Sequence, residues 1–343
     1  MNLGSVIAIG EALIDRLGPL GGDPSCDLPV TDCLGGAPAN VACALSRLGV
    51  NVSFLGCLGN DTFGKNFSNL LIQRGINISG LQEDNLRPTR VVLVRRDSFG
   101  ERSFEGFAGD IGLGFADQAI SREKIIRDWP LVKENVQWLI GGTIPLASEI
   151  SSKAFLWCIE KAVNAKIKIA LDLNWRPTFW RDQSSMVLEP SPEEKHQILS
   201  ILKNVSLIKL AKEEAYWFFN TSDPTQIASS FAHRPSVVVT DGSNPISWRL
   251  GNHTGKSFAM KPSSVVDTTG AGDAFVAGLI YKLLSVDLDQ ISQQIAEDII
   301  QFGIACGSHV CTGIGAIDPQ PFLEDIHGLL TKSTGGISLK ERD

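Results

Sequence analysis

The feature that most constrains this chain is a series of short segments that are apolar throughout, separated by longer amphipathic segments. The apolar segments lie at residues 6–10, 52–59, 136–142, 167–174, 205–211 and 236–242. A half-exposed strand would alternate apolar and polar residues, whereas a strand in a parallel sheet is buried on both faces. These segments therefore predict a parallel sheet that is covered on both sides.

The amphipathic segments between them predict helices at residues 38–49, 62–75, 151–163 and 193–204. The first opens with Pro38 and places Val41, Leu45 and Leu48 on one face. Strand and helix alternate over much of the chain, which is typical of βαβ units with right-handed crossovers. We therefore expect an α/β fold around a central, mostly parallel sheet.

Two segments interrupt this alternation, at about residues 16–34 and 88–108. The first is rich in glycine and proline, and the second alternates apolar and polar residues around the turn sequence DSFGER. Such one-sided strands predict a small β lid inserted into a single domain of residues 1–330. An open β edge is commonly covered by a partner, which suggests a homodimer through the lid. The polar residues 331–343 predict a disordered tail.

Composition excludes several classes of partner. The net charge is −7 and the chain has no lysine or arginine block, which argues against nucleic acid or an anionic membrane as the main partner. The seven cysteines are scattered and form no CxxC pair, as expected in a reducing compartment. The N-terminus lacks the features of a signal peptide, and no apolar run is long enough to span a membrane. We expect a soluble, cytoplasmic protein; a plastid stroma stays open if a transit peptide has been removed.

The run DTTGAGDAF, residues 267–275, predicts an anion-binding helix start. A helix that begins near Gly270 presents unpaired N–H groups and the positive end of its dipole. Gly270 and Gly272 let a phosphate approach the backbone without meeting a Cβ. Asp273 beside an incoming phosphate makes sense as a base that removes a proton from the attacking nucleophile. A plain glycine-rich turn with an acidic first-turn residue is the alternative.

A second phosphate motif fails on its spacing. In GNHTGKS, residues 251–257, three residues separate Gly251 from Gly255, whereas a P-loop needs four. No helix pattern follows it. We interpret this segment as a hairpin turn.

A second glycine pair, Gly35 and Gly36, comes just before a predicted helix whose first turns contain Asn40. Two N–H groups and a carboxamide suit a polyhydroxylated ligand, because each hydroxyl needs a donor and an acceptor. Asp15, which we place at the end of the first strand, would accept from a pair of vicinal hydroxyls. An ordinary loop and a solvated strand end are the alternatives.

Together these motifs resemble the ribokinase-like (PfkB) family of sugar kinases, and among its members most resemble fructokinases. The two family signatures match GGAPANVACALSRLG and DTTGAGDAFVAGLI, with GERSF and DLNWRPTFW between them. The resemblance covers roughly residues 5–325. It implies a ribokinase-like three-layer α/β/α sandwich with a β lid, and transfer of the ATP γ-phosphoryl group to a sugar hydroxyl.

The resemblance also implies roles for individual residues. Asp273 aligns with the catalytic base of the family, and the backbone of Gly270, Ala271 and Gly272 with its anion hole. The positions that hold the sugar correspond to Asp15, Gly35, Gly36 and Asn40. Arg176 lies near the sugar in the family, where it contacts the ligand or braces the lid.

For the cofactors, the resemblance implies ATP and Mg²⁺, and it allows activation by K⁺. Asp267 and Thr269 align with positions that hold a monovalent cation, and the loop 311–316 could complete that site. The positions for the nucleotide and the magnesium–phosphate region are Thr240, Gly242, Gly272 and Glu214. Two departures affect ATP binding: Ala211 replaces the asparagine of an Asn-x-x-Glu motif, and Pro245 replaces a glycine of the nucleotide loop.

The substrate stays open between several classes. Fructose is the leading acceptor. A kinase for an acidic sugar such as 2-keto-3-deoxygluconate would need a cation at the ligand's carboxylate, for which the candidates are Arg176, Arg90, Arg95 and Arg96. A nucleoside would favour an aromatic lid, which Phe99, Phe104 and Phe107 could form. A catalytically idle scaffold protein would be expected to lose the base or the glycines, and this chain keeps them.

Overall fold

The computed structural model describes residues 4–97, 102–181 and 187–334. Its main sheet has nine strands in the order β13-β12-β11-β10-β9-β8-β1-β4-β5. From β11 to β5 neighbouring strands are parallel, and β12 and β13 are antiparallel. The strands are β1 (Ser5–Ile9), β4 (Asn51–Gly59), β5 (Leu81–Asp84), β8 (Val136–Gly141), β9 (Lys168–Asp172), β10 (Leu207–Ala211), β11 (Ser236–Thr240), β12 (Ile246–Leu250) and β13 (His253–Ser257). All six predicted strands are therefore confirmed.

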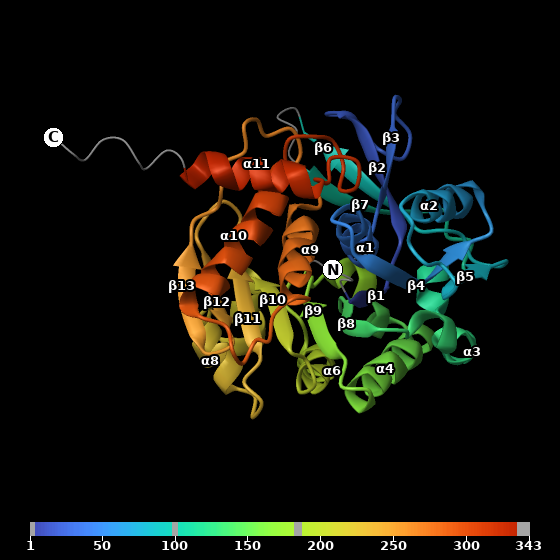
Figure 1. Ribbon diagram of the computed structural model, residues 1–343. Coiled ribbons are helices and arrows are strands. Elements are labelled where there is room, and N and C mark those ends of the chain that lie inside the picture. The colour runs from blue at the N-terminus through green and yellow to red at the C-terminus, as the bar shows by residue number, and fades with distance from the viewer. Residues whose placement is uncertain (1–3, 98–101, 182–186, 335–343) are drawn as a thin grey trace.

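Helices cover both faces of this sheet (Figure 1). On one side lie α1 (Ala37–Arg47), α2 (Thr62–Gln73), α9 (Ala271–Leu283) and α10 (Gln293–Val310), with α11 (Leu323–Thr334) packed against α10. On the other lie α3 (Arg122–Val132), α4 (Glu149–Asn164), α6 (Pro192–Leu202), α7 (Lys212–Phe219) and α8 (Pro224–Ser229). Short helical turns are η1 (Ala116–Ala119), η2 (Ile144–Ala147) and α5 (Pro177–Trp180). The three-layer α/β/α fold is confirmed.

Strand β1 shows why the strand sequences are apolar throughout. Val6 and Ala8 point into the core beneath α1 and α9, whereas Ile7 and Ile9 point into the core beneath α4. All four side chains are fully buried. Because successive side chains in a strand alternate between faces, a sheet between two helical layers requires apolar residues at every position.

A second sheet of four strands, in the order β3-β2-β6-β7, forms the lid. Its strands are β2 (Leu13–Leu20), β3 (Thr31–Gly35), β6 (Val91–Arg96) and β7 (Arg102–Ala108). The antiparallel pairing of β6 with β7 confirms the predicted hairpin. One placement was wrong: Asp15 lies within β2 of the lid, paired with Cys33, and not at the end of the first strand. The chain leaves the central sheet directly after β1, so the lid begins earlier than predicted.

The order of the strands defines where a ligand would bind. β1 lies between β4 and β8; the chain first continues to β4 and β5 on one side, and later builds β8 to β13 on the other. In open α/β sheets, ligands bind in the crevice at the carboxyl ends of the strands where this reversal occurs. The lid strands follow β1 at that same edge.

Two further sequence expectations can be compared with the structure. The segment 251–257 forms the turn and second strand of the β12–β13 hairpin, which confirms that it is not a P-loop. The predicted tail at 331–343 was wrong in its first four residues, because α11 continues through Thr334. The prediction rested on the polar composition of the segment, which is compatible with the last turn of a helix on the surface. Residues 335–343 lie outside the described residues.

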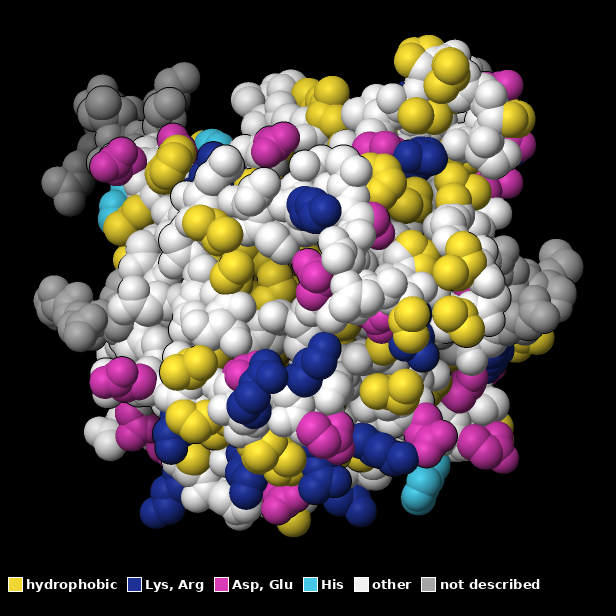
Figure 2. Space-filling view, turned by 90° about the vertical axis from the view of Figure 1, so that its right-hand side faces the viewer, with side chains coloured by type: hydrophobic (Ala, Val, Ile, Leu, Met, Phe, Trp, Pro, Cys, Tyr) yellow, Lys and Arg dark blue, Asp and Glu magenta, His cyan; other side chains and the backbone are white. Residues whose placement is uncertain are grey.

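Surface and membrane features agree with the composition. On the face shown in Figure 2, most lysine and arginine side chains lie in the lower part of the view, with acidic side chains among them. Within the described ranges, no helix is long and apolar enough to cross a membrane. Free cysteines include Cys43, Cys57, Cys158 and Cys306, all of them buried.

Candidate active site

A cavity of about 530 Å³ lies between the carboxyl edge of the main sheet and the lid. It is lined by residues from β2, β6 and β7 of the lid, from the end of β9 and the middle of β10, and from the first turns of α1 and α9. The predicted site residues that line it are Asp15, Gly36, Asn40, Arg176, Thr269, Gly270, Gly272 and Asp273. Segments far apart in the sequence therefore meet in one place, as the fold rule predicts.

Asp273 lies in the first turn of α9 and faces this cavity. Its Oδ2 accepts a hydrogen bond of 2.8 Å from Nδ2 of Asn40, which belongs to the first turn of α1. Burial raises the pKa of Asp273 to about 6, against the hydrogen bond from Asn40 and the positive charges of Lys209 and Arg176, which lower it. A carboxylate with a pKa near neutrality can accept a proton and release it again.

The N-cap residues of α1 and α9 are glycines with positive φ. Gly270 caps α9 with a φ of 77°, and a Cβ there would lie 2.5 Å from Cβ of Ala316. Gly36 caps α1 with a φ of 104°, and a Cβ there would lie 2.6 Å from the carbonyl oxygen of Glu11. Side chains rarely tolerate these φ values. Both helix N-termini therefore lie at the cavity with no side chain on the capping residue between the backbone and a ligand.

Glu11 lines the same cavity, directly after β1. Its Oε1 accepts a hydrogen bond of 3.1 Å from the backbone N–H of Ala37, at the start of α1. Within the described part of the chain, Oε2 is buried without a hydrogen-bond partner, as is Oδ1 of Asn40. Burial raises the pKa of Glu11 to about 8, so this side chain is largely protonated at neutral pH. A sugar hydroxyl in the cavity could satisfy both atoms.

Lys209 and Asp172 form an ion pair at the cavity wall, where Nζ donates to Oδ2 at 2.8 Å. They are neighbours on β10 and β9. Burial acts to lower the pKa of Lys209, but the carboxylates of Asp172 and Glu214 raise it above its usual value. The lysine is therefore positively charged beside the start of α9.

Asp267 is buried and joins the two segments that we predicted to bind a monovalent cation, 267–269 and 311–316. Its Oδ1 accepts from the N–H and the hydroxyl of Thr269, and its Oδ2 accepts from the N–H of Gly315 at 2.7 Å. The loops 267–269 and 311–316 are thus adjacent. Over the described ranges, no group of three or more His, Cys, Asp or Glu side chains could hold a metal ion. A cation there would depend on backbone oxygens.

Several predicted residues lie close to the cavity without lining it. Gly35 ends β3, where a Cβ would lie 2.6 Å from Oδ2 of Asp15, and Ala271 is the first residue of α9. Thr240 ends β11 and pairs with Ala211 on β10, with Gly242 in the turn that follows. These positions share the carboxyl edge of the sheet with the cavity.

Glu214 is buried behind the cavity. Its two oxygens accept the backbone N–H groups of Trp175 and Ala211, both at 2.6 Å. Burial raises the pKa of Glu214, and the nearby charge of Asp172 raises it further. Glu214 therefore holds the end of β10 against the segment after β9. Oδ1 of the neighbouring Asp172, by contrast, is buried without a hydrogen-bond partner within the described residues.

The lid arginines are occupied elsewhere. Arg90 is buried, pairs with Asp117 through two hydrogen bonds, and lies within 4.7 Å of the ring centres of Phe107, Phe115 and Phe179. Arg95 pairs with Asp23 and Glu105, and Arg96 donates to the carbonyl of Gly18. Among the described arginines, only Arg176 lines the cavity. This finding removes the lid arginines as ligands for an acidic sugar.

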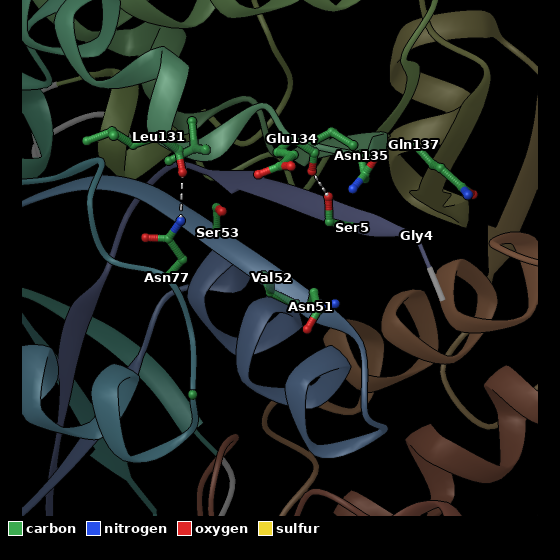
Figure 3. Close-up of a pocket in the computed structure, with 13 residues that line it drawn as sticks. Gly4, Ser5, Asn51, Val52, Ser53, Asn77, Leu131, Glu134, Asn135 and Gln137 are labelled. Atoms are coloured by element: carbon green, nitrogen blue, oxygen red, sulfur yellow. Dashed lines mark hydrogen bonds between the residues drawn. The ribbon is translucent and has the colours of Figure 1, made fainter. Parts of the chain in front are cut away.

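A larger cavity, of about 710 Å³, lies at the opposite edge of the sheet (Figure 3). It is lined by Ser5, Asn51 and Val136, the first residues of β1, β4 and β8. Two of the polar side chains shown there donate to backbone carbonyls, Ser5 to Glu134 and Asn77 to Leu131. Size alone therefore does not identify the site; the charged and glycine-rich groups converge on the smaller cavity.

Comparison with known proteins decides the family. Residues 4–323 match the family described as pfkB family carbohydrate kinase. The chain belongs to this pfkB family. It is 30% identical over 335 residues to the probable fructokinase-6, chloroplastic, of Arabidopsis thaliana, which covers 96% of this chain and 83% of the relative. It is also 30% identical to a fructokinase of Vibrio alginolyticus, over 93% of this chain and 96% of the relative.

Solved structures of pfkB-like fructokinases share the fold. A fructokinase from Xylella fastidiosa with bound ATP superposes with a TM-score of 0.80 at 25% identity, covering 96% of this chain and 99% of that one. A fructokinase from Vibrio cholerae O395, bound to fructose, ADP and calcium, gives a TM-score of 0.77 at 25% identity over 96% and 100%. A double mutant of the Vibrio cholerae enzyme, bound to fructose, ADP and potassium, gives 0.76 at 26% over 96% and 99%.

This pfkB carbohydrate kinase has site residues that the sequence reasoning missed. Glu11, Asp172, Asn174 and Lys209 line the cavity. Three of them carried a signal in the sequence. Glu11 follows the apolar segment 6–10, Asp172 lies near the end of the segment 167–174, and Lys209 interrupts the segment 205–211. Charged residues are rarely buried in strands unless they are paired or functional. Asn174 carried no comparable signal.

Proposed function

We propose that this pfkB carbohydrate kinase is an ATP-dependent fructokinase, which converts D-fructose and ATP to fructose 6-phosphate and ADP. The observation that carries the proposal is Asp273, which lies in the first turn of α9, lines the cavity and accepts a hydrogen bond from Asn40 there. A base and an anion-binding helix start at one point are what phosphoryl transfer to an alcohol requires.

In the proposed reaction, Asp273 accepts the proton of the substrate's primary hydroxyl. The hydroxyl oxygen forms a bond to the γ-phosphorus of ATP as the bond between that phosphorus and the bridging oxygen breaks, and ADP leaves with the electron pair. The first-turn N–H groups of α9, at Gly270, Ala271 and Gly272, stabilise the charge on the transferring group. The raised pKa of Asp273, about 6, lets the carboxyl return its proton to water.

The sugar would be held by groups from the lid and from α1. Asp15 of β2 and Asn40 line the cavity. Within the described residues, Oε2 of Glu11 and Oδ1 of Asn40 have no hydrogen-bond partner, so both atoms suit sugar hydroxyls. Fructose is favoured because the relatives described above are fructokinases. Arg176 alone is available for an acidic sugar among the described arginines, so 2-keto-3-deoxygluconate is less well supported.

A nucleoside is the second candidate substrate, because two aromatic side chains, Phe104 of β7 and Phe179 of α5, line the cavity. Such rings stack on bases as readily as they pack on a sugar ring. Phe107 packs behind them, with ring centres 5.0 Å from each. Phe99 lies outside the described residues. An idle scaffold is opposed by the convergence of the base and the glycines.

ATP would extend from the start of α9 toward Thr240 and Gly242 at the end of β11. Asp172 is the carboxylate that fits a magnesium–phosphate complex, because its Oδ1 is buried and unpartnered within the described residues, whereas both oxygens of Glu214 already accept backbone N–H groups. When bound, Mg²⁺ would neutralise phosphate charge. We propose that K⁺ binds between the loops 267–269 and 311–316, which Asp267 joins.

Two predictions concern the cellular context. A homodimer through the edges of the lid is our proposal for its assembly, and sedimentation of the purified protein tests it. A cytoplasmic location also stays a prediction, with the plastid as the alternative, since one relative is described as chloroplastic. Cell fractionation distinguishes them.

The test of the proposed function is ADP release with ATP, Mg²⁺ and K⁺ across fructose, ribose, 2-keto-3-deoxygluconate, adenosine and no acceptor. We expect release with fructose, and the product should carry its phosphate at the primary 6-position by NMR. Release with adenosine alone would instead establish the nucleoside kinase. No release with any acceptor, from a folded protein, would favour the scaffold and would point to Ala211 and Pro245.

A further inference from the structure

Lys209 is a charged residue in the middle of a buried strand. It belongs to β10, where its neighbours Ile208 and Leu210 are fully buried. Its side chain reaches the cavity and is 12% exposed. Burying an ammonium group in this way is costly unless a partner or a ligand compensates for the lost water.

The structure supplies only part of that compensation. Within the described residues, Nζ makes one hydrogen bond, to Oδ2 of Asp172. Glu214 lies close enough to raise the pKa of Lys209, but its oxygens accept backbone N–H groups. An ammonium group has three donors, so the lysine keeps donor capacity for a ligand in the cavity.

The position of Nζ indicates what that ligand is. A Cβ placed on Gly272 would lie 3.4 Å from Nζ, so the ammonium group lies beside the first turn of α9. Gly272, Asp273 and Lys209 line the same cavity. A positive charge next to bare helix N–H groups adds to the field that attracts an anion.

We propose that Lys209 contacts the transferring phosphoryl group and stabilises its charge in the transition state, with Asp172 as the residue that positions the ammonium group. The inference rests on the proposed kinase function. The ammonium keeps its protons throughout, and the proton of the acceptor goes to Asp273. Ala211 stands where the Asn-x-x-Glu motif of the family has asparagine, and Lys209, two residues before it, provides a hydrogen-bond donor.

A purely structural pair is the competing explanation, because Lys209 and Asp172 are cross-strand neighbours. The two explanations differ in one measurable respect. A structural pair affects folding and the binding of ADP alike, whereas a transition-state contact affects the chemical step and leaves ground-state ADP binding almost unchanged.

The test compares wild type, Lys209→Met, Asp172→Asn and Lys195→Met. Lys195→Met is the matched control, since Lys195 of α6 forms a 2.8 Å ion pair with Glu189 and does not line the cavity. Each variant is measured for kcat with ATP and the accepted sugar. Each is also measured for ADP affinity with Mg²⁺ and that sugar, with and without aluminium fluoride, a mimic of the transferring phosphoryl group.

We expect Lys209→Met to lower kcat by about 100- to 1,000-fold, to keep ADP affinity within a few-fold, and to lose the tightening by aluminium fluoride. Asp172→Asn should lower kcat by about 10-fold through the same step. The control should match wild type. If Lys209→Met does not fold, Asp172→Asn carries the test through its aluminium fluoride response.

An active wild type whose variants keep both kcat and the aluminium fluoride response would overturn this inference alone. Equal losses of ADP affinity with and without aluminium fluoride would overturn it in favour of the structural pair. A folded wild type that releases no ADP with any acceptor would overturn the proposed function, and this inference with it.

Discussion

Asn40 and Asp273 are 233 positions apart in the chain, yet Nδ2 of Asn40 donates to Oδ2 of Asp273 at 2.8 Å. The bond joins the first turns of α1 and α9, which pack against each other on one face of the sheet. The hydrogen bond fixes Oδ2 of Asp273, the proposed base. Oδ1 of Asn40 is buried without a partner among the described residues and is available to a ligand.

Replacing Asn40 by alanine should change both the base and the sugar affinity. The hydrogen bond lowers the pKa of Asp273, so its loss raises that pKa above the present value of about 6. Since the deprotonated carboxylate is the active form, the acidic limb of kcat/KM should begin near pH 6 in wild type and move up by about 1 pH unit in Asn40→Ala. KM for the sugar should rise. The measurement is the pH dependence of kcat/KM.

Gln320→Ala is the control for this experiment. Its Nε2 donates to the backbone carbonyl of Asn40 at 2.8 Å, so the substitution disturbs the same helix turn without touching Asp273. Its acidic limb should match that of wild type. An unmoved limb in Asn40→Ala would show that the asparagine does not tune the base.

Gly270→Ala should abolish most activity and should lower stability through both backbone strain and a collision. Its φ of 77° is unfavourable for alanine, and its Cβ would collide with Ala316, which would displace the start of α9. Gly75→Ala is the matched variant, because Gly75 has a φ of 70° with open space around it. Gly75→Ala should lose about 1–2 kcal/mol in urea unfolding from backbone strain alone, and Gly270→Ala should lose more because of the collision; only Gly270→Ala should lose kcat. Equal kcat values would argue against the anion hole.

Glu11 should make folding stability fall as pH rises. Burial raises its folded pKa to about 8, whereas its ordinary value is 4.5. The contribution is therefore complete below pH 4.5 and is lost as pH rises through about 8. Glu11→Gln cannot ionise, so between about pH 5 and pH 8 wild type should lose up to about 1.4 kcal/mol per pH unit relative to it. Urea unfolding at several pH values measures the slopes; parallel slopes would contradict the raised pKa.

Arg90→Met should be strongly destabilising, because it leaves the carboxylate of Asp117 buried and unpaired. Loss of one partner from a buried pair costs about 3–5 kcal/mol. Arg16→Met provides the comparison, since its pair with Asp32 has a similar length but is partly exposed, and it should cost about 1 kcal/mol or less. The double variant Arg90→Met/Asp117→Asn should recover part of the loss in urea unfolding. A cost for Arg90→Met as small as that for Arg16→Met would refute this account of the pair.

The features that the sequence predicted are those encoded by neighbouring residues. The helix start at Gly270 is specified within a few positions by its glycines, Asp273 and the apolar pattern that follows. The strands are specified by apolar residues on both faces, as the opposite burial of Val6 and Ile7 shows. The family signatures then indicated which of these elements meet.

Features that depend on distant pairs were not predicted. Arg90 was a candidate ligand until the structure paired it with Asp117 and three phenylalanine rings, a combination that no local pattern encodes. Asp15 was placed on the wrong sheet because the end of a strand and the start of a lid strand look alike in sequence. Lys209 interrupts an apolar strand, which was a usable signal that a buried charge has a partner or a ligand.

The most direct test of the central claim is fructose-dependent ADP release by wild type and by Asp273→Asn, with ADP binding measured in parallel. The amide cannot accept the proton but keeps the shape of the side chain. We predict release by wild type, a loss of about 100- to 10,000-fold in kcat for the variant, and similar ADP affinity for both. A variant that retains the wild-type kcat would contradict the role of Asp273 as the base.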